Sequence, residues 1–225
     1  HDQILAQIYY LLGKNFYFSG NQAKAMESYY KVLPIAESLN IPELLAIPYC
    51  AIGRANCYIA NFKEAVEYIQ KGLKILPKEE ILEQIYSIGI LAQAYAALGR
   101  KHEALKEIEH LQKEYGGISN ELFSLYVQFF TASVSSMVGN PFKAVKESEK
   151  SYDMAKDLKN IAIEINSLFS IGRAYGCIPG KTEESIKSIS RAVNLAKEHH
   201  QVVGLFMLIF SLAENYLFIG NIRVA

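Results

Sequence analysis

Apolar and small residues recur along this chain with the period of an α-helix, and they do so in paired segments. In the pair at Ala46–Leu76, small Gly53 lies in the first segment and small Ala65 in the second, with Ala60-Asn61 between them. These spacings follow the helical period of about 3.6 residues, not the strand period of two. The pattern predicts two antiparallel helices that touch where their side chains are smallest.

The same layout recurs at intervals of 39 to 41 residues over the whole sequence. A regular recurrence of two matched small positions is hard to obtain by chance, and it indicates a repeat architecture. No low-complexity linker breaks the chain, so we expect residues 1–225 to form a single all-α domain whose last repeat is incomplete. The small positions are Gly13, Gly53, Ala92, Ala132, Gly172 and Ala213 in the first helices, and Ala25, Ala65, Ala104, Ala144, Ser185 and Ala225 in the second helices.

Turns between the two helices of a unit are expected mostly at glycines, since glycine takes a positive φ without a Cβ clash. Ala60 departs from this pattern, and we expect the next residue, Asn61, to carry the positive φ there. In the fifth unit the turn is one residue longer, which accounts for the shifted Ser185. Aromatic residues three positions after the first small site are predicted to cover the junction with the second helix; they are Phe16, Tyr95, Tyr175 and Tyr216.

Composition narrows the possible functions. Lys+Arg and Asp+Glu are both 23, so the chain lacks the basic excess of a nucleic-acid-binding protein. Its most apolar stretch, Val202–Ala213, is too short to span a bilayer, and we expect it to be a buried helix rather than a membrane segment. The three cysteines form no CxxC motif and are typical of a reducing compartment, which predicts a cytoplasmic protein.

Motifs of catalysis are absent from the sequence. It contains no Gly-rich phosphate loop, no GxSxG and no HExxH. Cys50 and Cys57 could share one helix face, but no histidine completes a metal site, and packing is the better interpretation. We therefore expect no enzyme activity, no metal and no cofactor.

The repeat resembles the tetratricopeptide repeat over about the whole chain, through its small residues, the aromatics that follow them and its glycine turns. The period near 40 is longer than the roughly 34 residues common in that family. The resemblance implies an α-α superhelix, a right-handed solenoid of antiparallel helix pairs with about five and a half repeats. It also implies a non-enzymatic scaffold for protein–protein interactions. The family's usual tryptophan is replaced by Tyr9, Tyr49, Ile88, Gln128, Leu168 and Ile209.

The resemblance further implies that the first helices line a concave groove that binds a protein or peptide. Lys14, Arg54 and Arg173 lie at equivalent places and, if exposed, would form a sparse basic ladder for an acidic side chain or a carboxylate terminus. The alternatives are solvated surface charge for these cations and packing between repeats for the aromatic rings. The carboxylate clamp of chaperone-tail receptors is excluded by the residues at its positions. The predicted groove residues are Tyr10, Lys14, Tyr17, Arg54, Tyr86, Gln93, Tyr126, Phe129, Asn166, Phe169, Arg173 and Phe210.

A second hypothesis is a ligand-sensing or regulatory module of a larger bacterial-type signalling protein or transcription regulator. The sequence stops within its sixth repeat and no polar capping helix follows, whereas solenoids need polar ends for solubility. We therefore expect either a longer natural chain or self-association through the uncapped C-terminal helix.

Overall fold

The fold is all helical in the described part of the chain. The computed structural model describes residues 1–18, 21–201 and 205–218, and these ranges contain no strand. The predicted all-α class is confirmed. The elements are α1 (Asp2–Phe18), α2 (Gln22–Ser38), a short 3-10 helix η1 (Pro42–Leu44), α3 (Ala46–Tyr58), α4 (Phe62–Ile75), α5 (Ile81–Ala97), α6 (Lys101–Tyr115), α7 (Glu121–Met137), α8 (Pro141–Asp157), α9 (Ile161–Gly176), α10 (Thr182–Glu198) and α11 (Leu205–Phe218).

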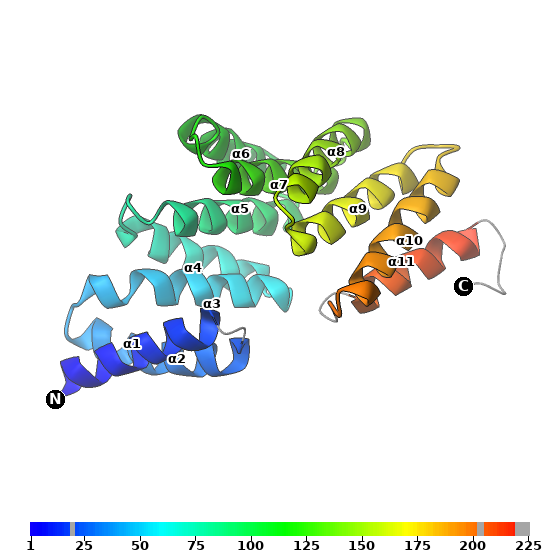
Figure 1. The fold of residues 1–225 in the computed structure, drawn as a ribbon. Coiled ribbons are helices and arrows are strands. Elements are labelled where there is room, and N and C mark those ends of the chain that lie inside the picture. Colours follow the sequence, from blue (N-terminus) through cyan, green and yellow to red (C-terminus); the bar gives the residue numbers. More distant parts are fainter. Residues whose placement is uncertain (19–20, 202–204, 219–225) are drawn as a thin grey trace. The chain divides into compact units, whose positions relative to one another are not determined.

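The helices fall into two compact units, His1–Glu107 and Ile108–Ala225, which we call unit 1 and unit 2. In unit 1, α1 packs on α2 and α3 on α4, while α2 also contacts α3 and α4 contacts α5 (Figure 1). In unit 2, α7 packs on α8 and α9 on α10, with α8 also on α9 and α10 on α11. First helices of neighbouring repeats also touch within each unit, as α3–α5, α7–α9 and α9–α11.

Small residues lie where the paired helices cross, as the sequence predicts. A Cβ atom added to Gly53 would lie 2.5 Å from Cγ1 of Ile69 on α4, and one added to Gly172 would overlap Ile189 on α10. Ala65 is fully buried at the facing position of α4. Larger side chains would therefore force these helices apart. The predicted small position Ala225 lies outside the described residues.

The turn between α3 and α4 corrects one local prediction. Ala60 itself has φ +64, while Asn61 has φ −82 and precedes the first residue of α4. The backbone N–H groups of residues 60 and 61 bond the carbonyls of Cys57 and Asn56. Gly99 has φ +74 in the same hydrogen-bonded turn after α5. The hydrogen-bonding pattern thus requires a residue with positive φ at this position of the turn, whatever its side chain.

Tyrosines at the predicted junction positions reach the second helix of the preceding repeat. Gln70 Nε2 on α4 donates to the hydroxyl of Tyr95 at 2.8 Å. In unit 2, the hydroxyl of Tyr175 donates to Glu149 on α8 at 3.5 Å. Each tyrosine therefore ties a first helix to the repeat before it.

The apolar helix α11 is only partly buried, which corrects the expectation of a buried helix for its described residues. Leu208 is buried, but 55% of Met207 and 52% of Phe210 are exposed. One side of α11 packs on α10 and α9 and the other faces solvent. No helix in the described ranges is long and apolar enough to cross a membrane.

Candidate functional site

Unit 1 contains half of the predicted groove residues. Tyr10 is partly buried; burial raises the pKa of its hydroxyl, and the carboxylates of Glu80 and Glu83 raise it further. Lys14 lies with its Nζ 5.6 Å from the centroid of the Tyr10 ring. Tyr86 and Gln93 of α5 are partly buried, and the side chain of Tyr17 lies outside the described part of the structure.

Arg54 does not serve as an exposed cation, which corrects the predicted ladder at this position. Only 3% of the residue is exposed. Its Nη1 forms an ion pair with Glu83 of α5 and donates to the Ser87 hydroxyl at 3.3 Å. A guanidinium removed from water needs such partners, because its desolvation is otherwise unfavourable by several kcal/mol. Arg54 therefore joins α3 to α5 instead of presenting charge to a ligand.

In unit 2, the aromatic residues predicted on α7 pack against a buried cluster. Tyr126 and Phe129 both contact the cluster of Leu125, Ala155 and Ile163. The Phe129 ring also lies 5.2 Å from that of Phe130 in an edge-to-face arrangement. Packing therefore accounts for much of the surface of these two rings.

The structure brings three predicted residues together on one side of α9, facing α11. Asn166, Phe169 and Arg173 follow each other at helical spacing, and Asn166 and Phe169 line a cavity of about 310 Å³. The rest of this cavity is mostly apolar. Its other lining residues are Ala162, Ile165, Gln201, Met207 and Leu208.

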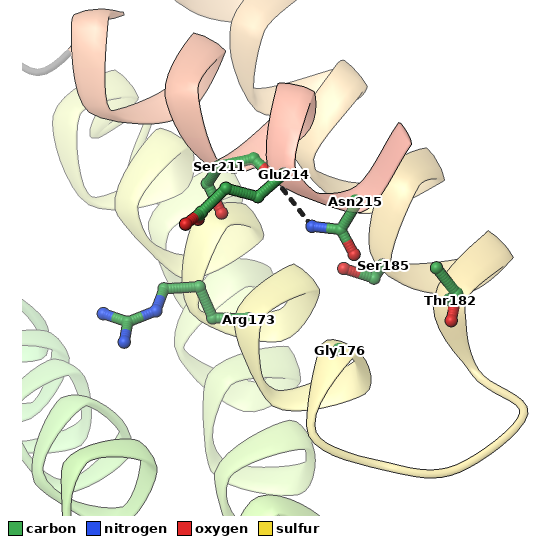
Figure 2. Close-up of a pocket in the computed structure, with 7 residues that line it drawn as sticks. All are labelled: Arg173, Gly176, Thr182, Ser185, Ser211, Glu214 and Asn215. Atoms are coloured by element: carbon green, nitrogen blue, oxygen red, sulfur yellow. Dashed lines mark hydrogen bonds between the residues drawn. The ribbon is translucent and has the colours of Figure 1, made fainter. Parts of the chain in front are cut away.

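A second, polar cavity of about 240 Å³ lies further along the same two helices (Figure 2). The Arg173 guanidinium lies 5.8 Å from the centroid of the Phe169 ring, so one side chain links the two cavities. Arg173 and Glu214 are exposed, and neither forms an ion pair with another described residue. We call the surface around both cavities the α9–α11 face. The polar cavity is lined by Arg173, Gly176, Thr182, Ser185, Ser211, Glu214 and Asn215.

Sequence reasoning missed most of this polar cavity. Ser185 was assigned only to helix packing, and it is indeed fully buried at the crossing of α9 and α10. The residue is also one of those that line the cavity, although its hydroxyl oxygen is itself buried. The available signal was a serine at a position where the earlier repeats have alanine. Among the described residues, no cluster of three or more His, Cys, Asp or Glu side chains could hold a metal ion.

Comparison with known proteins identifies the repeat. A family model described as tetratricopeptide repeat matches residues 6–38, which span α1 and α2. The crystal structure of Rap Protein complexed with Competence and Sporulation Factor is similar to this chain, with a TM-score of 0.73. This is a tetratricopeptide-repeat fold. The predicted resemblance is confirmed, and proteins of this kind generally mediate protein–protein interactions.

The similarity to the Rap protein extends over 99% of this chain and 74% of that chain at 12% sequence identity, so it concerns the fold alone. The crystal structure of MamA protein matches with a TM-score of 0.49 and 20% identity, over 88% of this chain and 95% of that chain. No curated protein sequence matches this chain.

Proposed function

We propose that this chain is a non-enzymatic, cytoplasmic scaffold that binds a peptide or a segment of a partner protein on the α9–α11 face. The observation that carries the proposal is the pair of cavities on that face, one mostly apolar and one polar, joined by the contact between Arg173 and Phe169. Nucleic acid and membranes are not part of the proposed partner set.

The apolar cavity supplies the anchoring surface in this proposal. Met207 borders it with 55% of its surface exposed, and neighbouring Phe210 is 52% exposed. Burying such surface against a partner contributes about 25 cal/mol per Å². Interface anchors are commonly large apolar side chains that fill pockets of this kind.

The polar cavity gives the bound segment a direction. Arg173 and Glu214 carry opposite charges on different helices, and no described residue neutralises either by an ion pair. A peptide that pairs with both has one preferred orientation, since reversing it would place like charges together. The contribution of Tyr10, Lys14, Tyr86 and Gln93 in unit 1 stays a prediction.

The alternative is a ligand-sensing or regulatory module of a larger signalling protein. It draws support from the fold, because the similar Rap protein was crystallised with Competence and Sporulation Factor. Both candidates place a ligand on the repeat surface. They differ in whether binding changes the behaviour of attached domains.

The proposal is tested by selecting binders from a displayed random-peptide library on the 225-residue chain. Selected peptides should lose roughly tenfold in affinity for Met207→Ala, because the apolar cavity loses a wall. Phe142→Ala is the matched control: Phe142 is 72% exposed on α8 and lines neither cavity, so its loss should leave affinity unchanged. Peptides that bind both variants equally well, or a selection without binders, would remove the α9–α11 face as the site.

A further inference from the structure

A third cavity, of about 450 Å³, is lined by residues of α8, α9 and α10, and we call it the α8–α10 cavity. It shares no lining residue with either cavity of the α9–α11 face. The half-buried rings of Tyr152 and Tyr175 supply its accessible apolar surface, because its other apolar residues, Leu168 and Ile171, are buried. The cavity is therefore a separate surface of unit 2.

Charged side chains in the α8–α10 cavity are separated by sign. Glu149 and Asp153 are four residues apart, so they share one side of α8. Lys187 and Arg191 are also four residues apart, on α10. All four are exposed. One side of the cavity thus carries two negative charges and the other carries two positive charges.

The two sides do not neutralise each other. In the part of the chain that the structure describes, none of these four residues forms an ion pair. Arg191 donates one hydrogen bond, to the Tyr152 hydroxyl at 2.8 Å, and its guanidinium has further N–H donors. Glu149 accepts only a long hydrogen bond of 3.5 Å, from Tyr175. Both sides therefore keep charge that is accessible to a ligand.

This separation by sign is not a general property of the repeat. Asp153 lies nine positions after the small residue of its helix, and the equivalent residue of α6 is Lys113. Arg191 lies six positions after the small residue of α10, and the equivalent residue of α8 is Lys150. The preceding pair of second helices therefore has lysine at both positions. Opposite charges at these two positions are particular to α8 and α10.

We propose that the α8–α10 cavity binds a segment of a partner polypeptide in which an apolar side chain lies between a basic and an acidic one. The basic side chain pairs with Glu149 and Asp153, and the acidic side chain pairs with Lys187 and Arg191. The apolar side chain packs on the tyrosine rings. This surface is additional to the α9–α11 face and does not depend on the proposed function.

Ligands of a single charge sign fit this cavity less well. A nucleic acid would place phosphates beside Glu149 and Asp153, and a purely basic segment would meet Lys187 and Arg191. The remaining charged residue of the cavity, Glu184, forms an ion pair with Lys181 and so adds little net charge. A ligand that carries both signs satisfies both sides.

The probe is a displayed peptide library in which every peptide carries one basic, one apolar and one acidic residue at varied spacing in a glycine–serine background. Peptides selected on the 225-residue chain should bind Asp153→Lys roughly five- to tenfold more weakly, because an attraction is replaced by a repulsion. Asp157→Lys is the matched control. It makes the same change in net charge four residues further along α8, where the exposed Asp157 does not line the cavity, so affinity should stay within about twofold.

Double-mutant cycles assign each peptide charge to one side of the cavity. Replacing the basic residue of the peptide by glutamine should weaken binding to the unchanged chain but not to Asp153→Lys. Replacing the acidic residue by glutamine should weaken binding to the unchanged chain but not to Arg191→Gln. Lys197→Gln is the control for α10, since Lys197 is exposed and lies outside the cavity. Circular dichroism should show unchanged helicity for all four variants.

The outcomes separate this inference from the proposed function. Coupling of the basic residue to Asp153 and of the acidic residue to Arg191 would support it. Equal losses in Asp153→Lys and Asp157→Lys would indicate an effect of net charge and overturn it. Peptides that depend on Met207 instead would also overturn it, while supporting the α9–α11 face. A selection without binders from this restricted library would overturn this inference alone.

A second copy of the chain is the other occupant to test. Sedimentation of the protein without peptide should show no dimer that Asp153→Lys dissociates. Such a dimer would assign the α8–α10 cavity to self-association and overturn the proposed partner.

Discussion

Arg54 in unit 1 and Arg173 in unit 2 occupy equivalent positions in their repeats, yet they have opposite environments. Arg54 is buried and ion-paired with Glu83, while Arg173 is exposed beside an open cavity. Each follows directly after the small residue of a first helix, Gly53 or Gly172. The residue's own place in the repeat therefore does not decide whether it is available to a ligand.

The following repeat makes the difference. Glu83 and Ser87 lie nine and five positions before Ala92, the small residue of the repeat that follows Arg54. In the repeat that follows Arg173, the residues nine and five positions before the small residue Ala213 are Gly204 and Leu208. Neither of those can compensate a positive charge. Lys14 is followed in this register by Leu44 and Pro48, which are apolar as well. The comparison teaches that a cation on a first helix is structural when a carboxylate of the next repeat forms an ion pair with it, as Glu83 does with Arg54, and free for binding when none does.

Among the variants that test this comparison, Glu83→Ala should change the free energy of unfolding most. It should lower the free energy of unfolding by about 3 kcal/mol, because the Arg54 charge would stay buried without its partner. Arg173→Ala should change it by no more than about 0.5 kcal/mol, as for an exposed side chain. Urea unfolding followed by circular dichroism measures both. Equal losses in the two variants would show that the cations are not used differently.

Two glycines in α9 sharpen the comparison within unit 2. Gly172→Ala should lower the free energy of unfolding by about 1–3 kcal/mol, since its Cβ overlaps Ile189. The Cβ added by Gly176→Ala would lie no closer than 3.3 Å to another residue's atoms, so this variant should keep its free energy of unfolding. Thermal unfolding of both variants checks this. A Gly176→Ala protein as unstable as Gly172→Ala would mean that Gly176 is also required for the helix packing.

The smallest effect concerns tyrosine–glutamate pairs at high pH. Burial and the hydrogen bond to Glu37 raise the pKa of Tyr49 to about 12, from the ordinary 10.0. Between these values the unfolded phenol ionises while the folded one keeps its proton, so stability should fall as pH rises from about 10 to 12. Burial and the Glu149 carboxylate also raise the pKa of Tyr175, but that ring is more exposed.

The test is the slope of unfolding free energy against pH. Tyr49→Phe should flatten this slope more than Tyr175→Phe, because it removes the more deeply buried phenol. An unchanged slope in Tyr49→Phe would contradict the assignment of this pH dependence to unit 1.

Much of the fold could be predicted because the forces that set it are local. Helix crossings need small residues, and these recur in the sequence at fixed intervals; Gly53 and Gly172 lie where the period places them. Ala60 shows where such reasoning fails, since the hydrogen-bonding pattern of the turn imposes a positive φ on an unfavourable residue. The boundary between unit 1 and unit 2 falls between Glu107 and Ile108, inside α6. The repeat pattern continues unbroken there and does not predict this boundary. The single domain stays a prediction.

The candidate site was predictable only in part. Asn166, Phe169 and Arg173 share one side of α9 because helical spacing dictates it. The role of Arg54 depends on Glu83, 29 residues away in the next repeat, and a motif confined to one repeat does not contain that information. Ser185 fits both a packing position and a cavity wall. That its hydroxyl forms no hydrogen bond is not encoded in the repeat pattern.

The ion pair between Arg54 and Glu83 also limits how this protein could evolve or be rebuilt. Repeat proteins are often lengthened or shortened by whole modules, on the assumption that each module tolerates any neighbour. Here the module that carries α3 depends on the one that carries α5 for a negative charge. Changing the order of these modules, or inserting a copy of another between them, would leave Arg54 buried without its carboxylate partner. Their sequence order is therefore part of what the chain encodes.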